Sequence, residues 1–153
     1  MSEATTPDAR SPGSGKSAES REPAGHTTGD ATGQATRRVD KPWGHELIWM
    51  VTERYVGKLI AISAGRRLSL QYHNEKDESI YILSGRLRLH LEDDAGAMTV
   101  REMTTGESAR VPVGRRHRFE AVDDVELIEV STPELDDVVR VEDDFGREGT
   151  SAP

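Results

Sequence analysis

The sequence contains no cysteine, few aromatic residues and no long apolar run. None of its 153 residues is cysteine, and aromatic residues make up 5%. The missing thiol excludes a disulfide framework, a thiolate nucleophile and a zinc site built on cysteine. No apolar run approaches the roughly 18 residues of a membrane span, so we expect no membrane partner. A metal site would have to use histidine, carboxylate or amide ligands.

Large apolar residues are also missing from the first quarter of the chain. Up to position 38 the only one is Met1, while Ser, Thr, Gly, Pro and Ala fill 25 of the 38 positions. Such a segment buries too little apolar surface to offset the entropy lost on ordering. The composition predicts a disordered tail over 1–38. The segment lacks the basic start and apolar stretch of a secretory signal, so we expect a cytoplasmic protein.

Basic residues are in the minority. The net charge of −8 lies entirely in residues 39–153, which hold 23 acidic and 15 basic residues. Nucleic-acid-binding proteins normally show the opposite balance, so we expect no nucleic-acid partner. The acidic surplus is concentrated late, with seven acids between Glu134 and Glu148. We expect residues 134–153 to form an acidic strap and tail, packed over the preceding domain with Arg140 and Asp144 paired to it.

From residue 39 onward the sequence predicts many short β-strands. The clearest is Arg86–Leu91, where leucines alternate strictly with polar residues, as in a strand with one buried face. Further strands are expected at His45–Val51, Arg54–Ile62, Leu68–Gln71, Ser79–Leu83, Met98–Val100, Ser108–Val111, His117–Ala121 and Val125–Val130. This spacing indicates an all-β sandwich or barrel over 39–133. One short helix is predicted over Glu134–Arg140, with Thr132 as its N-cap and Pro133 at its first position.

Two segments carry side chains that can bind a metal. Gln71 and His73 are two apart on an expected strand, so they point to the same face. Glu78 lies at the head of the next strand, and a Pro-x-Gly turn at 112–114 presents His117 at the head of another. If these strands share a barrel interior, the four side chains suit a first-row divalent metal with an open position. Each residue alone also fits an ordinary surface or hydrogen-bonded role, and spacing does not decide between the two.

These segments resemble the paired motifs of the cupin superfamily. The first motif is matched by Gly65, Gln71, His73, Glu78 and Gly85. The second is matched by Gly106, Pro112, Gly114 and His117. Gln71 replaces the first histidine of the general pattern, and Ala121 replaces a final asparagine. The resemblance implies a single cupin barrel, a double-stranded β-helix or jelly roll.

A narrower resemblance is to type II mannose-6-phosphate isomerases, the cupin domains often fused behind a mannose-1-phosphate guanylyltransferase. It rests on residues 41–44, 68–73, 126–131 and 136–147, and it covers nearly all of 39–149. Glutamine at position 71 belongs to that family's pattern. A chain of 153 residues has no room for the guanylyltransferase as well, so we expect a stand-alone domain. By analogy with other cupins of this size, we expect a homodimer. The resemblance implies a divalent metal, commonly zinc, with manganese, iron, cobalt or nickel as alternatives, held by Gln71, His73, Glu78 and His117.

The resemblance further implies an aldose–ketose isomerase that acts on a sugar phosphate, moving a proton between C1 and C2 through an enediolate. Lys58 and Lys76 are the candidates for the catalytic proton carrier, and phosphate binding is the alternative for each. Lys76 and Ile80 stand where the family has arginine and tryptophan, and lysine lacks the planar fork of arginine. The alternatives are a cupin metalloenzyme of another reaction class, such as an oxygenase or a step of specialised metabolism, or a non-catalytic cupin that binds a small molecule.

Overall fold

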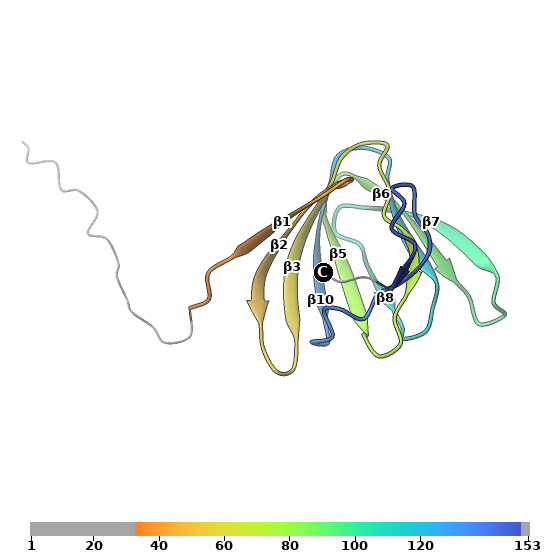
Figure 1. Ribbon diagram of the computed structural model, residues 1–153. Coiled ribbons are helices and arrows are strands. Elements are labelled where there is room, and N and C mark those ends of the chain that lie inside the picture. Colours follow the sequence, from red (N-terminus) through yellow and green to blue (C-terminus); the bar gives the residue numbers. More distant parts are fainter. Residues whose placement is uncertain (1–32, 151–153) are drawn as a thin grey trace, which may run out of the picture. The chain divides into compact units, whose positions relative to one another are not determined.

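The computed structural model describes residues 33–150, so most of the tail predicted over 1–38 lies outside the described residues. The described residues form twelve β-strands and no helix (Figure 1). In chain order the strands are β1 (Arg37–Lys41), β2 (Gly44–Val51), β3 (Val56–Ile62), β4 (Leu70–Tyr72), β5 (Glu78–Ser84), β6 (Arg86–Glu92), β7 (Met98–Thr104), β8 (Ser108–Val111), β9 (His117–Ala121), β10 (Val125–Ser131), β11 (Val139–Glu142) and β12 (Gly149–Thr150). The all-β prediction is confirmed, and no helix of this part of the chain could span a membrane.

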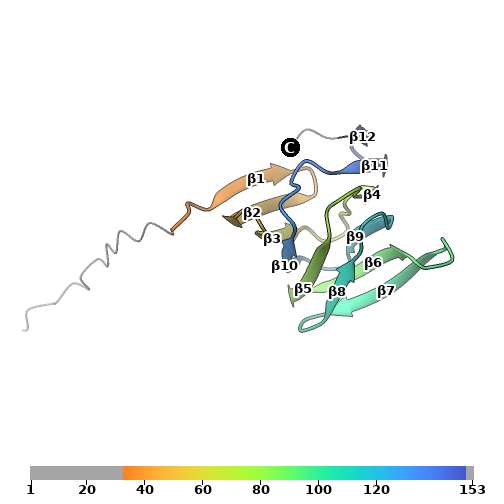
Figure 2. The ribbon, with the colours of Figure 1, turned by 90° about the horizontal axis from the view of Figure 1, so that it is seen from below.

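The strands build two six-stranded sheets that form the walls of one barrel (Figures 1 and 2). The strand order is β1-β2-β3-β10-β5-β8 in the first sheet and β12-β11-β4-β9-β6-β7 in the second. All these neighbouring pairs are antiparallel. From β3 onward most connections cross from one sheet to the other, as in a jelly roll. Residues at the ends of β4, β5 and β9 can therefore meet between the sheets.

The first sheet divides the barrel interior into an apolar end and a charged end. In β10, both Leu127 and Glu129 are buried on the inward face. The cross-strand register places Leu127 beside Ile60 and Ile82, and it places Glu129 beside Lys58. Burying a large aliphatic side chain contributes about 1.5–3 kcal/mol. The apolar end therefore holds the two sheets together, and the other end carries charged side chains in the same alternation.

The helix predicted over Glu134–Arg140 is wrong. This stretch turns and continues into β11, which pairs with β4. Thr132, the expected N-cap, instead accepts the backbone N–H of Asp77 at its Oγ1 atom (3.1 Å). Part of the acidic strap is thus an added strand of the second sheet. Its Asp144 forms the expected pairing with the barrel, through Arg67 at 2.6 Å, whereas the side chain of Arg140, which was also expected to pair, forms no ion pair among residues 33–150.

Edge strands differ most from the bounds predicted from the sequence. β1 starts at Arg37, two residues before the predicted boundary at Val39, and pairs with β2. β7 continues to Thr104, well beyond the predicted end at Val100. Both strands are largely exposed, so they lack the apolar alternation that marks a half-buried strand. The other predicted strands are confirmed, with ends that shift by at most two residues.

Two glycines of the first motif allow a matched test of backbone geometry. Gly65 and Gly85 both have positive φ, at 73° and 80°. A Cβ atom at Gly85 would lie 2.1 Å from the carbonyl oxygen of Asp124, whereas one at Gly65 would meet nothing within 4 Å. We expect Gly65→Ala to cost about 1–2 kcal/mol of unfolding free energy, because the left-handed backbone is strained. Gly85→Ala should cost about 3 kcal/mol or more, because a clash is added. Urea denaturation measures both losses, and equal losses would contradict this account.

Candidate metal centre

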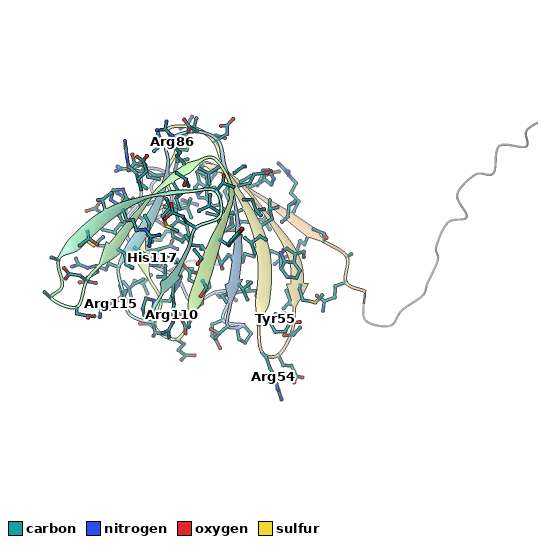
Figure 3. The ribbon with its side chains drawn as sticks, turned by 180° about the vertical axis from the view of Figure 1, so that it is seen from behind. Arg54, Tyr55, Arg86, Arg110, Arg115 and His117 are labelled. Atoms are coloured by element: carbon teal, nitrogen blue, oxygen red, sulfur yellow. The ribbon has the colours of Figure 1, made fainter. Side chains whose placement is uncertain are left out.

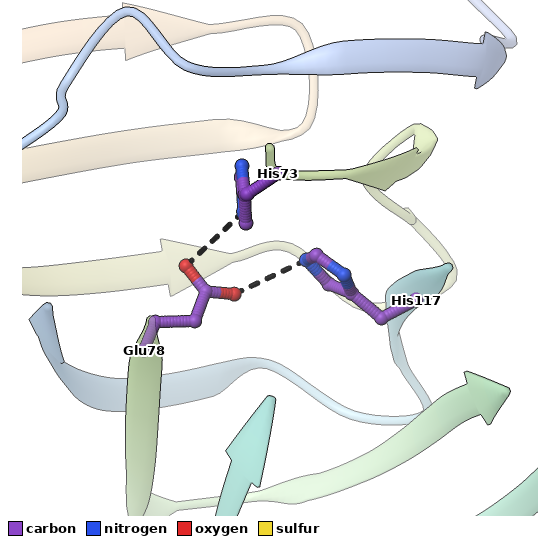
Figure 4. A group of neighbouring side chains, drawn as sticks. All are labelled: His73, Glu78 and His117. Atoms are coloured by element: carbon purple, nitrogen blue, oxygen red, sulfur yellow. Dashed lines mark ion pairs between the residues drawn. The ribbon is translucent and has the colours of Figure 1, made fainter. Parts of the chain in front are cut away.

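Three buried side chains from different strands meet at the charged end of the barrel (Figure 4). His73 directly follows β4, Glu78 begins β5 and His117 begins β9. His117 Nε2 lies 3.1 Å from Glu78 Oε1, and His73 Nε2 lies 3.4 Å from Glu78 Oε2. All three residues are at most 2% exposed. One ligand atom from each lies within 4.8 Å of the others, so the group could hold a metal ion.

Backbone contacts fix the proton on each histidine. His73 Nδ1 contacts the carbonyl oxygen of Asp137, and His117 Nδ1 lies 3.0 Å from the carbonyl oxygen of Arg115. A carbonyl only accepts hydrogen bonds, so both Nδ1 atoms donate. A neutral imidazole then has its lone pair on Nε2, directed at Glu78. Carbonyl acceptors of this kind are the usual outer partners of metal-binding histidines.

The ligand atoms lack other partners. Among the described residues, His73 Nε2, His117 Nε2 and Glu78 Oε1 form no hydrogen bond although all are buried. Buried polar atoms are normally satisfied, so three unsatisfied atoms that face one another require an explanation. A cation between them satisfies all three. Two imidazoles and one carboxylate are a suitable donor set for zinc or another first-row divalent metal.

Gln71, the fourth predicted ligand, lies next to this group. It is paired with His117 across β4 and β9, and it lines the same cavity as Glu78. Its Oε1 atom accepts a hydrogen bond from Ser69 Oγ at 2.7 Å, which leaves a second lone pair available. The structure thus brings Gln71 beside the three ligand candidates. Its coordination of the metal stays a prediction.

A carboxylate that sequence reasoning missed shapes the turn between His73 and Glu78. The side chain of Asp137 accepts the backbone N–H groups of Asn74 (3.0 Å), Glu75 (2.6 Å) and Lys76 (2.8 Å). Burial would raise the pKa of Asp137, but these donors outweigh it and lower the pKa to about 2. The residue therefore holds the turn with its side chain and the His73 ring with its carbonyl. No local signal separates it from the other acids of the strap.

Both predicted catalytic lysines lie in a buried chain of alternating charges. Lys76 Nζ lies 2.5 Å from Glu78 Oε2 and 2.8 Å from Glu129 Oε1. Lys58 Nζ lies 3.5 Å from the same Glu129 oxygen and 3.8 Å from Glu46 Oε2. Burial alone would lower the pKa of Lys76, but the charges of Glu129 and Glu78 outweigh it and raise the pKa. Lys76 is therefore protonated at neutral pH.

Glu129 is likewise kept charged by its neighbours in this buried chain of charges. Burial would raise the pKa of this carboxyl, but the charges of Lys58 and Lys76 outweigh it and lower the pKa. Glu129 was not among the site residues predicted from the sequence. The available signal was an acid at an inward position of the alternating β10 strand, between the buried Leu127 and Ser131.

A cavity of about 400 Å³ opens beside this group. Its lining includes Glu78 of the candidate metal centre, Gln71, both lysines and Glu129. A cavity of this size falls within the usual range for a small-molecule site, about 300–1,000 Å³.

Residues 28–143 match the family model described as the mannose-6-phosphate isomerase C-terminal domain. The chain belongs to this family. One relative is the mannose-1-phosphate guanylyltransferase ManC of Salmonella typhimurium, with 34% identity over 72% of this chain and 23% of its own length. Another is the xanthan biosynthesis protein XanB of Xanthomonas campestris, with 33% identity over 72% of this chain and 24% of its own length. The chain thus spans about a quarter of the length of these curated relatives.

Solved structures confirm the predicted cupin fold. KdgF from Halomonas sp. superposes with a TM-score of 0.55 and 19% identity, over 65% of this chain and 88% of that protein. Oxalate decarboxylase from Bacillus subtilis gives a TM-score of 0.62 and 18% identity, over 69% of this chain and 30% of that one. At such low identity these likenesses bear on the fold alone. The paired motifs of the sequence therefore identified the barrel correctly.

Proposed function

We propose that this chain is a metal-dependent aldose–ketose isomerase that acts on a sugar phosphate, of the mannose-6-phosphate isomerase type. The observation that carries the proposal is the convergence of His73 Nε2, His117 Nε2 and Glu78 beside a cavity of about 400 Å³. Membership of the mannose-6-phosphate isomerase C-terminal family supports the substrate class. A cytoplasmic location and a homodimer without nucleic-acid or membrane partners stay predictions.

The metal ligands in this proposal are Gln71, His73, Glu78 and His117. Zinc fits this donor set, as do manganese, iron, cobalt and nickel. When bound, a divalent metal would stabilise the negative charge that develops on a substrate oxygen during proton transfer. The outer contacts of the chain support this role, because carbonyls hold both imidazoles with Nε2 free.

Proton transfer is the task of the charged chain next to the metal ligands. Lys76 is held protonated by Glu129 and Glu78, and its raised pKa makes it a poor base and a weak proton donor, so it suits a fixed cation that stabilises negative charge on a substrate oxygen. Glu129 lies between Lys58 and Lys76 and stays ionised, so its carboxylate is free to accept a proton, while the same two cations lower its pKa and weaken it as a base. We propose Glu129 as the group that takes the proton from carbon, Lys76 as the cation that stabilises the developing oxyanion, and Lys58 as the cation that keeps Glu129 ionised.

An isomerase assay tests the proposal. The full chain, loaded with zinc or manganese, should convert mannose 6-phosphate to fructose 6-phosphate, and a chelator should abolish turnover. Glu129→Gln should lower kcat by about 10²–10⁴-fold at unchanged metal content, because a positioned acid–base group is lost. If the chain holds stoichiometric metal and leaves mannose 6-phosphate unchanged, the isomerase proposal is wrong.

A further inference from the structure

The cavity beside the candidate metal centre is richer in positive charge than the chain as a whole. Six basic side chains line it: Arg37, Lys41, Lys58, Lys76, Arg140 and Arg147. Four acidic side chains line it: Glu46, Glu78, Glu129 and Asp136. The whole chain has a net charge of −8, so this local surplus of cations runs against its overall balance. A cavity with a surplus of positive charge attracts anionic ligands.

Arg140 occupies a defined place relative to the metal ligands. It pairs with Gln71 across β11 and β4, and Gln71 pairs with His117 across β4 and β9. Directly opposed residues of antiparallel strands present their side chains on the same face of a sheet. Arg140 therefore continues the inward-facing row of Gln71 and His117. Two strand spacings separate its backbone from that of His117, roughly 10 Å.

Arg140 is also one of three cations of this cavity, with Arg37 and Lys41, that form no ion pair among residues 33–150. Its Nε atom is buried without a hydrogen-bond partner, and among residues 33–150 no carboxylate lies within ion-pair distance of its guanidinium. Arg147 differs, because its Nε and Nη2 atoms donate to the Asp143 carboxylate at 2.9 and 2.7 Å. Burial, followed by the charge of Arg147, lowers the pKa of Arg140, and the charges of Asp143 and Glu46 oppose this shift. A half-buried guanidinium with an unsatisfied nitrogen is available to a ligand that supplies negative charge and a hydrogen-bond acceptor.

We infer that Arg140 forms an oxyanion subsite that binds the phosphate group of the substrate, one strand beyond Gln71 and two beyond His117 on the same sheet. The planar guanidinium grips a phosphate through two parallel N–H···O bonds. The reacting carbons would then lie toward His117, and the phosphate toward β11. The identity of the sugar rests on the proposed function, whereas the anion subsite itself does not.

Binding to the metal-loaded full chain tests the subsite, with isothermal titration of mannose 6-phosphate, mannose and inorganic phosphate. Arg140→Gln should weaken mannose 6-phosphate binding by about 10- to 100-fold, because a charged hydrogen-bond pair is lost. It should abolish binding of inorganic phosphate, leave mannose binding unchanged, and leave metal content and melting temperature no lower than in the wild type. A purely structural arginine would instead lower the melting temperature and weaken all three ligands alike.

The matched control is Arg86→Gln, which removes the same charge outside the cavity. Arg86 is exposed and paired with Asp123, and Figure 3 places it at the rim of the barrel opposite Arg110 and Arg115. Its phosphate and mannose 6-phosphate affinities should equal those of the wild type. Arg140→Lys keeps the charge without the fork and should lose about 5- to 10-fold in affinity for mannose 6-phosphate.

The outcomes separate this inference from the proposed function. Phosphate binding that depends on Arg140 in a chain without isomerase activity would uphold the subsite and reject the isomerase. Isomerase activity with an unchanged KM in Arg140→Gln would uphold the isomerase and reject the subsite. Should Arg140→Gln fail to fold, Arg140→Lys decides, and wild-type affinity for both phosphate ligands in that variant overturns the subsite.

Discussion

Replacing His117 with alanine is expected to abolish stoichiometric metal binding while the barrel stays folded. The variant removes one of three buried ligand atoms that lie within 4.8 Å of one another. Loss of an outer partner of a metal ligand typically costs about 10- to 100-fold in affinity, so loss of a ligand itself should exceed about 100-fold. Metal content after dialysis, measured by elemental analysis, checks the loss, and circular dichroism checks the fold.

Thermal unfolding gives a second readout of the same variant. A metal present at about 100 times its dissociation constant stabilises the folded state by about 2.7 kcal/mol. The wild type should gain this increment and His117→Ala should not. The control is His90→Ala on β6, because His90 contacts Glu120 at 2.7 Å and takes no part in the candidate centre. Undiminished metal content in His117→Ala would reject the ligand assignment.

Lys76→Met should lower the unfolding free energy of the metal-free protein by about 3–5 kcal/mol, which is the usual effect of removing one partner of a buried ion pair. The change leaves Glu78 and Glu129 without the ammonium that lies 2.5 and 2.8 Å from them. The two carboxylates then repel each other, and a bound dication would offset part of this repulsion by neutralising Glu78. Urea denaturation with and without metal should therefore show a larger loss in the metal-free protein.

Two companion variants define the origin of that loss. Lys76→Arg keeps the positive charge and should retain most of the stability. Lys76→Met combined with Glu129→Gln should recover part of the lost unfolding free energy, because one of the two unpaired carboxylates is gone. The double-mutant cycle of these variants measures the interaction energy between Lys76 and Glu129. Lys76→Met with wild-type stability in the absence of metal would show that the buried charges are compensated by other groups.

The barrel could be predicted from the sequence because its strands carry their own signals. The alternation at Arg86–Leu91 and the two gapped motifs involve residues close together in the chain, so they can be recognised in one sequence. The helix over Glu134–Arg140 failed for the opposite reason. Thr132 accepts a hydrogen bond from the backbone of Asp77, and β11 pairs with β4. These contacts between residues distant in sequence override the local capping signal.

Some residues of the candidate site could likewise be predicted from the sequence, and others could not. The motif spacing predicted His73, Glu78 and His117 as a group, and the structure brings them together. Glu129 and Asp137 were missed, because their roles arise from register and from a strap that returns over the turn after His73. Strand alternation alone marks Glu129 as inward, but it does not say which lysines lie beside it.

The most direct test of the account is the position of a bound metal. Crystals of the full chain grown with zinc should show one strong anomalous peak at the zinc edge. We expect this peak about 2.0–2.2 Å from His73 Nε2, His117 Nε2 and a Glu78 carboxylate oxygen. No peak there at full zinc loading, or a peak held by Nδ1 of either histidine, would contradict it.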